Sequence, residues 1–201
     1  MTYELKPLSC DPAKLKGLSE KLIVSHYENN YGGAVKRLNA ITAQLESLDF
    51  ATAPIFVING LKREELIASN SMILHELYFD GLGGESEPDK DLRSALVRDF
   101  GTLERWRAEF SAMGKTIGWV LLTYSHRGKK LINQWAPDHS CCLAGASPIL
   151  ALDMYEHSYH IDYGAKAAAY VDAFMQNINW ENVSTLYRSI HASKAAKPPQ
   201  L

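Results

Sequence analysis

Two long stretches of helically spaced apolar residues occupy the N-terminal part of this chain and restrict the folds open to it. The first begins at Asp11-Pro12, an N-cap acid followed by proline at the first helical position, and runs to about residue 49. Gly32-Gly33 interrupts it, which predicts a kink or two helices end to end. A second helix is expected over 62–79, ended by Asp80-Gly81. Two long helices with one connection predict an antiparallel hairpin.

The spacing of the apolar residues changes beyond this hairpin. The glycine- and acid-rich stretch 81–91 is the best candidate linker. The runs 119–124 and 130–135 flank turn residues and predict a β-hairpin, and the run 149–152 predicts a third, buried strand. Further helical patterns cover 92–99, 103–113, 165–177 and 181–191.

These elements predict an α+β fold with two domains. Residues 1–84 would form an N-terminal domain built on the antiparallel α-hairpin. Residues 90–201 would form a C-terminal domain with a three-stranded antiparallel sheet and surrounding helices. With 201 residues, the chain can bury a core without disulfides or structural metal ions.

Composition excludes several classes of protein. A net charge of −2 without a cluster of Lys and Arg argues against an electrostatic nucleic-acid binder. No apolar run is long enough to span a bilayer, and no signal peptide is expected, so no membrane partner is predicted. The cysteines are odd in number, with Cys141 and Cys142 adjacent, which predicts a reducing, cytoplasmic setting.

Four residues form a candidate metal-binding set. Asp153 and His157 lie four positions apart at the end of the buried strand-like run, so both can point at one ion. His26 and His75 each lie on the apolar side of a helix pattern. Either histidine alone is more often an ordinary core residue, but burying all four groups without a cation is costly. Three histidines and one carboxylate suit a redox-active iron or manganese centre better than a structural zinc.

The sequence Pro-Ile-Leu-Ala-Leu-Asp-Met-Tyr-Glu-His-Ser-Tyr at 148–159 resembles the signature of the iron/manganese superoxide dismutases, whose usual core is Asp-x-Trp-Glu-His-x-Tyr. Similar segments extend over nearly the whole chain, at 3–8, His26, 71–75, Gly118-Trp119, 170–171 and 179–180. The resemblance implies that one Fe or Mn ion per subunit is bound by His26, His75, Asp153 and His157, with solvent as a fifth ligand.

The resemblance also implies an activity and roles around the metal. The activity is the disproportionation of superoxide to dioxygen and hydrogen peroxide by ping-pong redox cycling of the metal. His139 would donate a hydrogen bond to the bound solvent, with Gln134 a weaker candidate. Trp119, Phe79 and Tyr155 would form the walls of the pocket.

Glu156 resembles the residue that bridges to a metal-binding histidine of the neighbouring subunit. The chain is therefore expected to form a homo-oligomer, either a dimer or a tetramer, with Glu156 near the interface.

The chain departs from the family where substrate enters. Asn30 and Ala34 stand where the family usually has a histidine and a gateway tyrosine. His160 replaces a tyrosine that contacts this histidine across the dimer, and Ala167 replaces an arginine that attracts the substrate, with Lys166 beside it as a stand-in. Tyr27 or Tyr31 is the candidate for the missing gateway hydroxyl; spacing does not choose between them, and Tyr31 is counted among the site residues. These changes predict a slower reductive half-reaction and a shifted pH profile.

Two other functions are compatible with the same residues. A catalytically weak or inactive relative would keep the metal to stabilise a dimer, but that leaves four unaltered ligands unexplained. A non-haem iron oxygenase normally binds iron through two histidines and one carboxylate, so the third histidine disfavours that class. The same ligands serve iron and manganese, and the sequence leaves that choice open.

Overall fold

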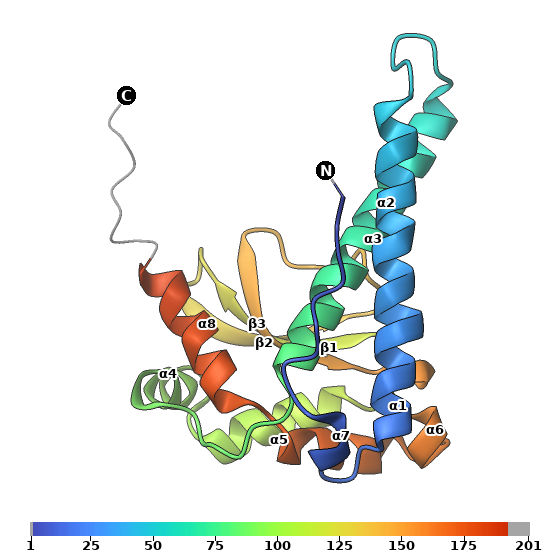
Figure 1. The fold of residues 1–201 in the computed structure, drawn as a ribbon. Helices are drawn as coiled ribbons and strands as arrows, with labels where there is room; N and C mark the ends of the chain where they lie inside the picture. Colours follow the sequence, from blue (N-terminus) through green and yellow to red (C-terminus); the bar gives the residue numbers. More distant parts are fainter. Residues whose placement is uncertain (1, 193–201) are drawn as a thin grey trace.

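The computed structural model describes residues 2–192 and has an α+β fold. Two long helices, α2 and α3, stand side by side, and a three-stranded sheet lies next to their lower part (Figure 1). The remaining helices gather around the sheet and the base of the helical pair (Figure 1). This arrangement confirms the predicted fold class.

The first helical stretch is a single rod made of three segments, α1 (Glu20–Ser25), the π-helical η2 (His26–Tyr31) and α2 (Gly32–Glu46) (Figure 1). The predicted start at Asp11 is wrong. Asp11 caps only the 3-10 turn η1 (Pro12–Lys14) by accepting from the amide of Ala13, whereas Ser19 caps α1 by accepting from Leu22. The predicted irregularity at Gly32-Gly33 lies one turn earlier, in the π-helical segment that begins with His26.

The second long helix, α3, extends from Ile55 to Asp80, so it begins earlier than predicted and ends where predicted. Pro54 occupies its N-cap and Gly81 its C-cap. The two long helices bury facing apolar side chains, which confirms the antiparallel hairpin. These side chains include Val35, Leu38, Ile41, Leu45, Ala68, Met72 and Leu74.

The sheet has the order β2-β1-β3, and both pairings are antiparallel. The central strand β1 (Trp119–Ser125) pairs with β2 (Lys130–Ala136) and with β3 (Ala146–Asp153), as the apolar runs predicted. Trp119 is opposite Asp153 in one register and opposite Ala136 in the other. The end of β3 that carries Asp153 is therefore held beside Trp119.

The other helices cover the sheet and the base of the hairpin; the four longer ones lie close to their predicted positions, and the two short ones were not predicted. They are α4 (Lys90–Phe100), α5 (Leu103–Met113), the short η3 (Glu156–Ser158) and α6 (His160–Tyr163), α7 (Ala167–Gln176) and α8 (Trp180–Ala192). Stacked rings of Tyr78, Phe174 and Phe110, with centroids 5.9 and 6.5 Å apart, connect α3 through α7 to α5. Within residues 2–192, no helix is both long and apolar enough to cross a membrane.

Gly118 directly precedes β1 and contacts the chain at the ends of β2 and β3, where the sheet carries Asp153. Its φ is +108°, a conformation that side chains with a Cβ rarely adopt, and its carbonyl accepts from the amide of Met154 at 2.8 Å. A Cβ at this position would lie 2.2 Å from the carbonyl oxygen of Ala136. Only glycine fits here without moving β1 away from β2.

We expect Gly118→Ala to lower the free energy of unfolding by about 2 kcal/mol or more, because it adds backbone strain and a clash with backbone. Gly60→Ala is the matched control, since Gly60 is exposed in α3 and a Cβ there meets nothing within 4 Å. The control should raise stability by about 0.5–1 kcal/mol. Urea unfolding of both variants measures the difference, and equal stabilities would contradict the assignment of strain to Gly118.

Candidate metal centre

The four predicted ligands converge on one point. One ligand atom from each of His26, His75, Asp153 and His157 lies within 4.8 Å of the others. The Nε2 atoms of the three histidines lie 3.1, 3.5 and 3.1 Å from Oδ2 of Asp153. The first three residues are buried, and the side chain of His157 is 28% exposed. The sequence-based prediction of a shared site is confirmed.

The ligands come from four different elements. His26 opens the π-helical segment, His75 lies on the buried face of α3, and Asp153 ends β3. Oδ1 of Asp153 accepts from the amide of Tyr155 at 2.8 Å, and the hydroxyl of Ser158 donates to the Asp153 carbonyl at 2.8 Å. These two bonds fold the chain tightly after β3 and bring His157 back toward the carboxylate.

An unpaired nitrogen of the site fits a metal ion. Nδ1 of His75 donates to the carbonyl of Ser71 at 2.6 Å, so its Nε2 carries a lone pair. That Nε2 is buried in the cluster without a hydrogen-bond partner. A buried nitrogen of this kind is rare unless a cation binds it. Three imidazole nitrogens and one carboxylate oxygen are suitable ligands for iron or manganese.

Electrostatics keeps these groups in the protonation state that a metal requires. Burial lowers the pKa of His75 to about 3 and also lowers the pKa of His26. Burial alone would raise the pKa of Asp153, but hydrogen bonds from His157 and His26 outweigh it and bring that pKa well below its usual range. The buried site therefore holds an ionised carboxylate beside neutral imidazoles at neutral pH.

His139 lies next to the cluster, and Trp119 fixes its orientation. Nε1 of Trp119 donates to Nδ1 of His139 at 2.9 Å, so Nδ1 is an acceptor and the proton of the neutral ring is on Nε2. The ring stacks on Tyr155 with centroids 5.0 Å apart, and its centroid lies 6.2 Å from that of His75. Burial lowers the pKa of His139 and favours the neutral ring.

Gln134, the other predicted donor, points to a different group. Its side-chain amide donates to the carbonyl of Cys141 at 3.2 Å.

Aromatic rings surround the ligands where the sequence predicted walls. Phe79 lies 5.1 Å from His26 between ring centroids, Trp119 lies 5.2 Å from His75, and Tyr155 stacks on His157 at 5.6 Å. These rings exclude water from the ligands on several sides.

Tyr31 and Tyr27 use their hydroxyls elsewhere. The hydroxyl of Tyr31 accepts from the amide of Lys6 and donates to Glu76, both at 3.0 Å, and that of Tyr27 donates to the carbonyl of Lys6 at 2.6 Å. Burial raises the pKa of Tyr31 to about 12. The ring of Tyr31 stacks near His75, with centroids 6.4 Å apart, so this residue supports a ligand from behind.

A hollow of about 320 Å³ lies beside the cluster, and we call it the access hollow. Asn30 and Ala34 line it, together with His139 and Ser71 of the metal environment, whereas Tyr27 and Tyr31 do not. Its lining residues are Asn29, Asn30, Gly33, Ala34, Arg37, Ile67, Ala68, Ser71 and His139.

The sequence analysis assigned no role to two residues of α3 that support the site. Ser71 lies four residues before His75 and accepts its Nδ1 proton through the backbone, and helical spacing alone points to this pairing. The side chain of Asn70 donates to the carbonyl of His139 at 2.5 Å, and no local pattern indicates that contact.

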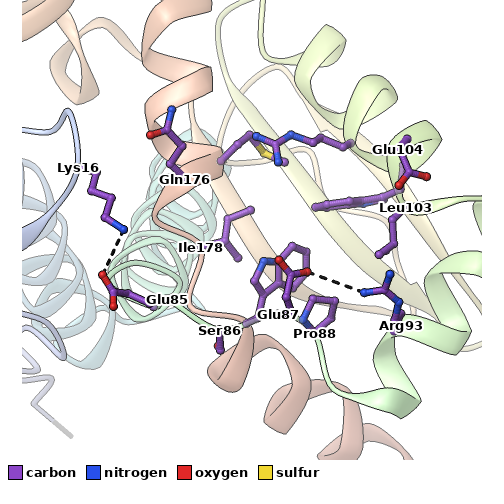
Figure 2. A pocket seen from close by; sticks show the side chains of 15 residues that line it. Lys16, Glu85, Ser86, Glu87, Pro88, Arg93, Leu103, Glu104, Gln176 and Ile178 are labelled. Atoms are coloured by element: carbon purple, nitrogen blue, oxygen red, sulfur yellow. Dashed lines mark ion pairs between the residues drawn. The ribbon is translucent and has the colours of Figure 1, made fainter.

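A larger hollow of about 530 Å³ lies at the base of the molecule, between the segment 84–88, α5 and the end of α7 (Figure 2). Lys16 pairs with Glu85 at 3.2 Å on one side of it, and Arg93 pairs with Glu87 at 3.9 Å on the other (Figure 2). Its lining includes neither the four metal ligands nor Ser71 and His139 beside them, so size alone does not identify the functional site.

Comparison with known proteins gives one consistent result. The family model "Iron/manganese superoxide dismutases, C-terminal domain" matches residues 88–186. The chain is 70% identical to "Superoxide dismutase [Fe]" of Cupriavidus metallidurans over 191 residues, which are 93% of this chain and 97% of that relative. It is 33% identical over 196 residues to "Superoxide dismutase [Fe]" of Aquifex pyrophilus, covering 92% of both chains. It is equally similar to "Superoxide dismutase [Mn] 2" of Haloferax volcanii, covering 93% of this chain and 96% of the relative.

We expect the metal-free protein to lose stability as the pH falls below about 6.5, the pKa of an unperturbed histidine. The unfolded chain then binds a proton that the buried His75 does not bind, so this residue lowers the free energy of unfolding by about 1.4 kcal/mol per pH unit. The lowered pKa of His26 acts in the same direction. This stability is fully present above pH 6.5, and His75 stops contributing further loss below pH about 3.

Urea unfolding of the metal-free protein between about pH 7 and 5 measures this slope. His75→Gln should reduce the slope by the equivalent of one proton, whatever its effect on stability at pH 7. An unchanged slope would show that His75 titrates normally in the folded chain.

Proposed function

The chain belongs to the iron/manganese superoxide dismutase family, and on this premise we propose a part for each residue around its metal centre. It is a superoxide dismutase, which converts superoxide to dioxygen and hydrogen peroxide with one Fe or Mn ion at His26, His75, Asp153 and His157. The convergence of these four ligands within 4.8 Å, in a chain 70% identical to a superoxide dismutase, carries this conclusion.

The protein environment sets the charge at which the metal works. When bound, the metal supplies the electron acceptor and the electron donor for the two half-reactions. The ionised Asp153 contributes one negative charge and favours the trivalent ion, while the neutral imidazoles of His26 and His75 add none. Burial of all three keeps this balance independent of bulk solvent.

We propose that His139 donates its Nε2 proton toward the solvent position beside the cluster. The hydrogen bond from Trp119 to Nδ1 supports this role, because it leaves Nε2–H as the free donor of the neutral ring. The stack on Tyr155 and the bond from Asn70 to the backbone hold the ring in place.

Hydrogen peroxide forms from superoxide with one electron and two protons, and the second proton is proposed to come from water in the access hollow. Ala34 offers no hydroxyl there, and the hydroxyl of Tyr31 is engaged with Glu76, which argues against Tyr31 as a gateway donor. Tyr31 instead is proposed to hold His75 and the N-terminal segment in position. Slower peroxide formation and a shifted pH profile remain the expected consequences.

We propose that the metal is iron. The relative from Cupriavidus metallidurans, at 70% identity, is named as an iron enzyme, whereas the manganese relatives share about a third of their residues with this chain. Loading the metal-free protein with each metal in turn and comparing the two rates of dismutation tests this choice.

A cytoplasmic location is also proposed. Cys10, Cys141 and Cys142, all in the described part of the chain, are free thiols, and free thiols are typical of reducing compartments.

A homodimer is proposed to form around Glu156. This residue is exposed on η3 next to His157, whose Asp153 contact uses only Nε2. Nδ1–H of His157 can therefore donate a hydrogen bond to the Glu156 carboxylate of a second copy, which would orient this ligand from outside. The exposed Ile161 adds apolar surface beside it, with a relative exposure of 47%.

We expect His139→Ala to lower kcat of the iron-loaded enzyme by about 10–100-fold and to move the midpoint potential of the metal, because a hydrogen bond that tunes the metal is lost. Gln134→Ala is the control and should stay within about twofold of wild type, because Gln134 bonds the Cys141 carbonyl. Pulse radiolysis and redox titration provide the two measurements. An unaltered potential in the His139 variant would exclude the proposed role.

We expect Glu156→Ala to raise the dissociation constant of the dimer by about 30-fold or more. The substitution removes the charge-assisted hydrogen bond between copies and leaves Nδ1 of His157 without its acceptor. Glu181→Ala, an exposed change on α8, serves as the control for loss of one negative charge. Sedimentation equilibrium over a range of concentrations measures both variants. Two variants with the same dissociation constant would argue against an interface at Glu156.

A further inference from the structure

The access hollow lies beside the metal cluster, and its lining runs from buried Ser71 to exposed residues of the first rod. At its inner end, Oγ of Ser71 lies 3.4 Å from Nδ1 of His75, and the ring of His139 lies 6.2 Å from that of His75. At its outer end is Arg37 of α2, whose side chain is 56% exposed. An ion that enters past Arg37 therefore reaches groups that contact the metal ligands.

The hollow is open because small residues line it. Gly33 and Ala34 of the first rod and Ala68 of α3 leave space that a larger side chain would fill. No heavy atom lies within 4 Å of where a Cβ at Gly33 would be. Access here is therefore not controlled by a bulky gate.

Arg37 is the one charged side chain among the residues that line this hollow. Its neighbours there are two asparagines, a serine, small or apolar residues and His139. The interior of the hollow thus favours an anion.

Glu64 of α3 pairs with Arg37 but does not line the hollow. Its own side chain is 32% exposed and also pairs with Arg63 at 3.1 Å. Exposed pairs of this kind are weak and screened by salt. Glu64 therefore holds the guanidinium at the mouth and offsets only part of its field.

We propose that Arg37 is the residue that attracts superoxide into the access hollow and positions it before it reaches the metal. Superoxide is a small monoanion at neutral pH, and a positive charge at the entrance of the hollow increases its local concentration. Lys166, the stand-in that the sequence suggested, does not line the hollow. This proposal concerns delivery of substrate and rests on the dismutase activity.

The test compares Arg37→Gln with Lys36→Gln in the iron-loaded enzyme. Lys36 is the adjacent exposed cation on the same helix, does not line the hollow, and its loss changes net charge equally. We expect Arg37→Gln to lower kcat/KM about threefold at low ionic strength and to flatten its dependence on salt, while Lys36→Gln alters neither. Glu64→Gln should act in the opposite direction and raise kcat/KM.

A second measurement distinguishes loss of substrate attraction from damage to the metal centre. Azide is a monoanion that is not turned over, and its binding to the ferric protein is followed by absorbance. Arg37→Gln should weaken azide binding about threefold with an unchanged iron content, and Arg37→Lys should restore most of the affinity. If the Arg37 and Lys36 variants have the same salt dependence and the same azide affinity, the proposal is wrong, even if dismutation itself is confirmed.

Discussion

The buried carboxylate of Asp153 is the group on which the rest of this structure depends. Its side chain is fully buried, and three imidazole nitrogens lie within 3.5 Å of one of its oxygens. An ionised group in such a place is stable only with compensating positive charge, which a transition-metal ion supplies. Because its partners come from the N-terminal rod, α3 and η3, binding the metal also fixes these elements relative to one another.

The fold holds this group by contacts that leave little freedom. Gly118 and Trp119 fix the end of β3, and the Tyr78–Phe174–Phe110 stack holds α3 against the helices around the sheet. The same tryptophan sets the tautomer of His139. The element that positions a ligand thus also orients the hydrogen-bond donor beside the metal, so the chemistry and the packing share one set of contacts.

The entrance follows a different physical logic from the centre. The ligands lie in a dry, aromatic environment, whereas the access hollow is lined by amides, small residues and one exposed cation. Substitutions in the hollow alter the rate at which an anion reaches the metal and the source of the protons for the reaction. They leave the geometry of the four ligands intact. This separation explains how the chain keeps all four ligands while departing from the family pattern at Asn30 and Ala34.

The sequence by itself determined the order and type of the elements, because helical and strand periods are local properties. It also indicated the four ligands, through their residue types and through the resemblance of residues 148–159 to the superoxide dismutase signature. Only the tertiary structure decided that α1 is capped by Ser19, while Asp11 caps a short 3-10 turn before it. It likewise decided that Trp119 bonds His139, that the hydroxyl of Tyr31 turns to Glu76, and that Arg37 stands at the entrance. Each of these contacts joins residues that are remote along the chain, and their distance and orientation depend on how whole elements pack.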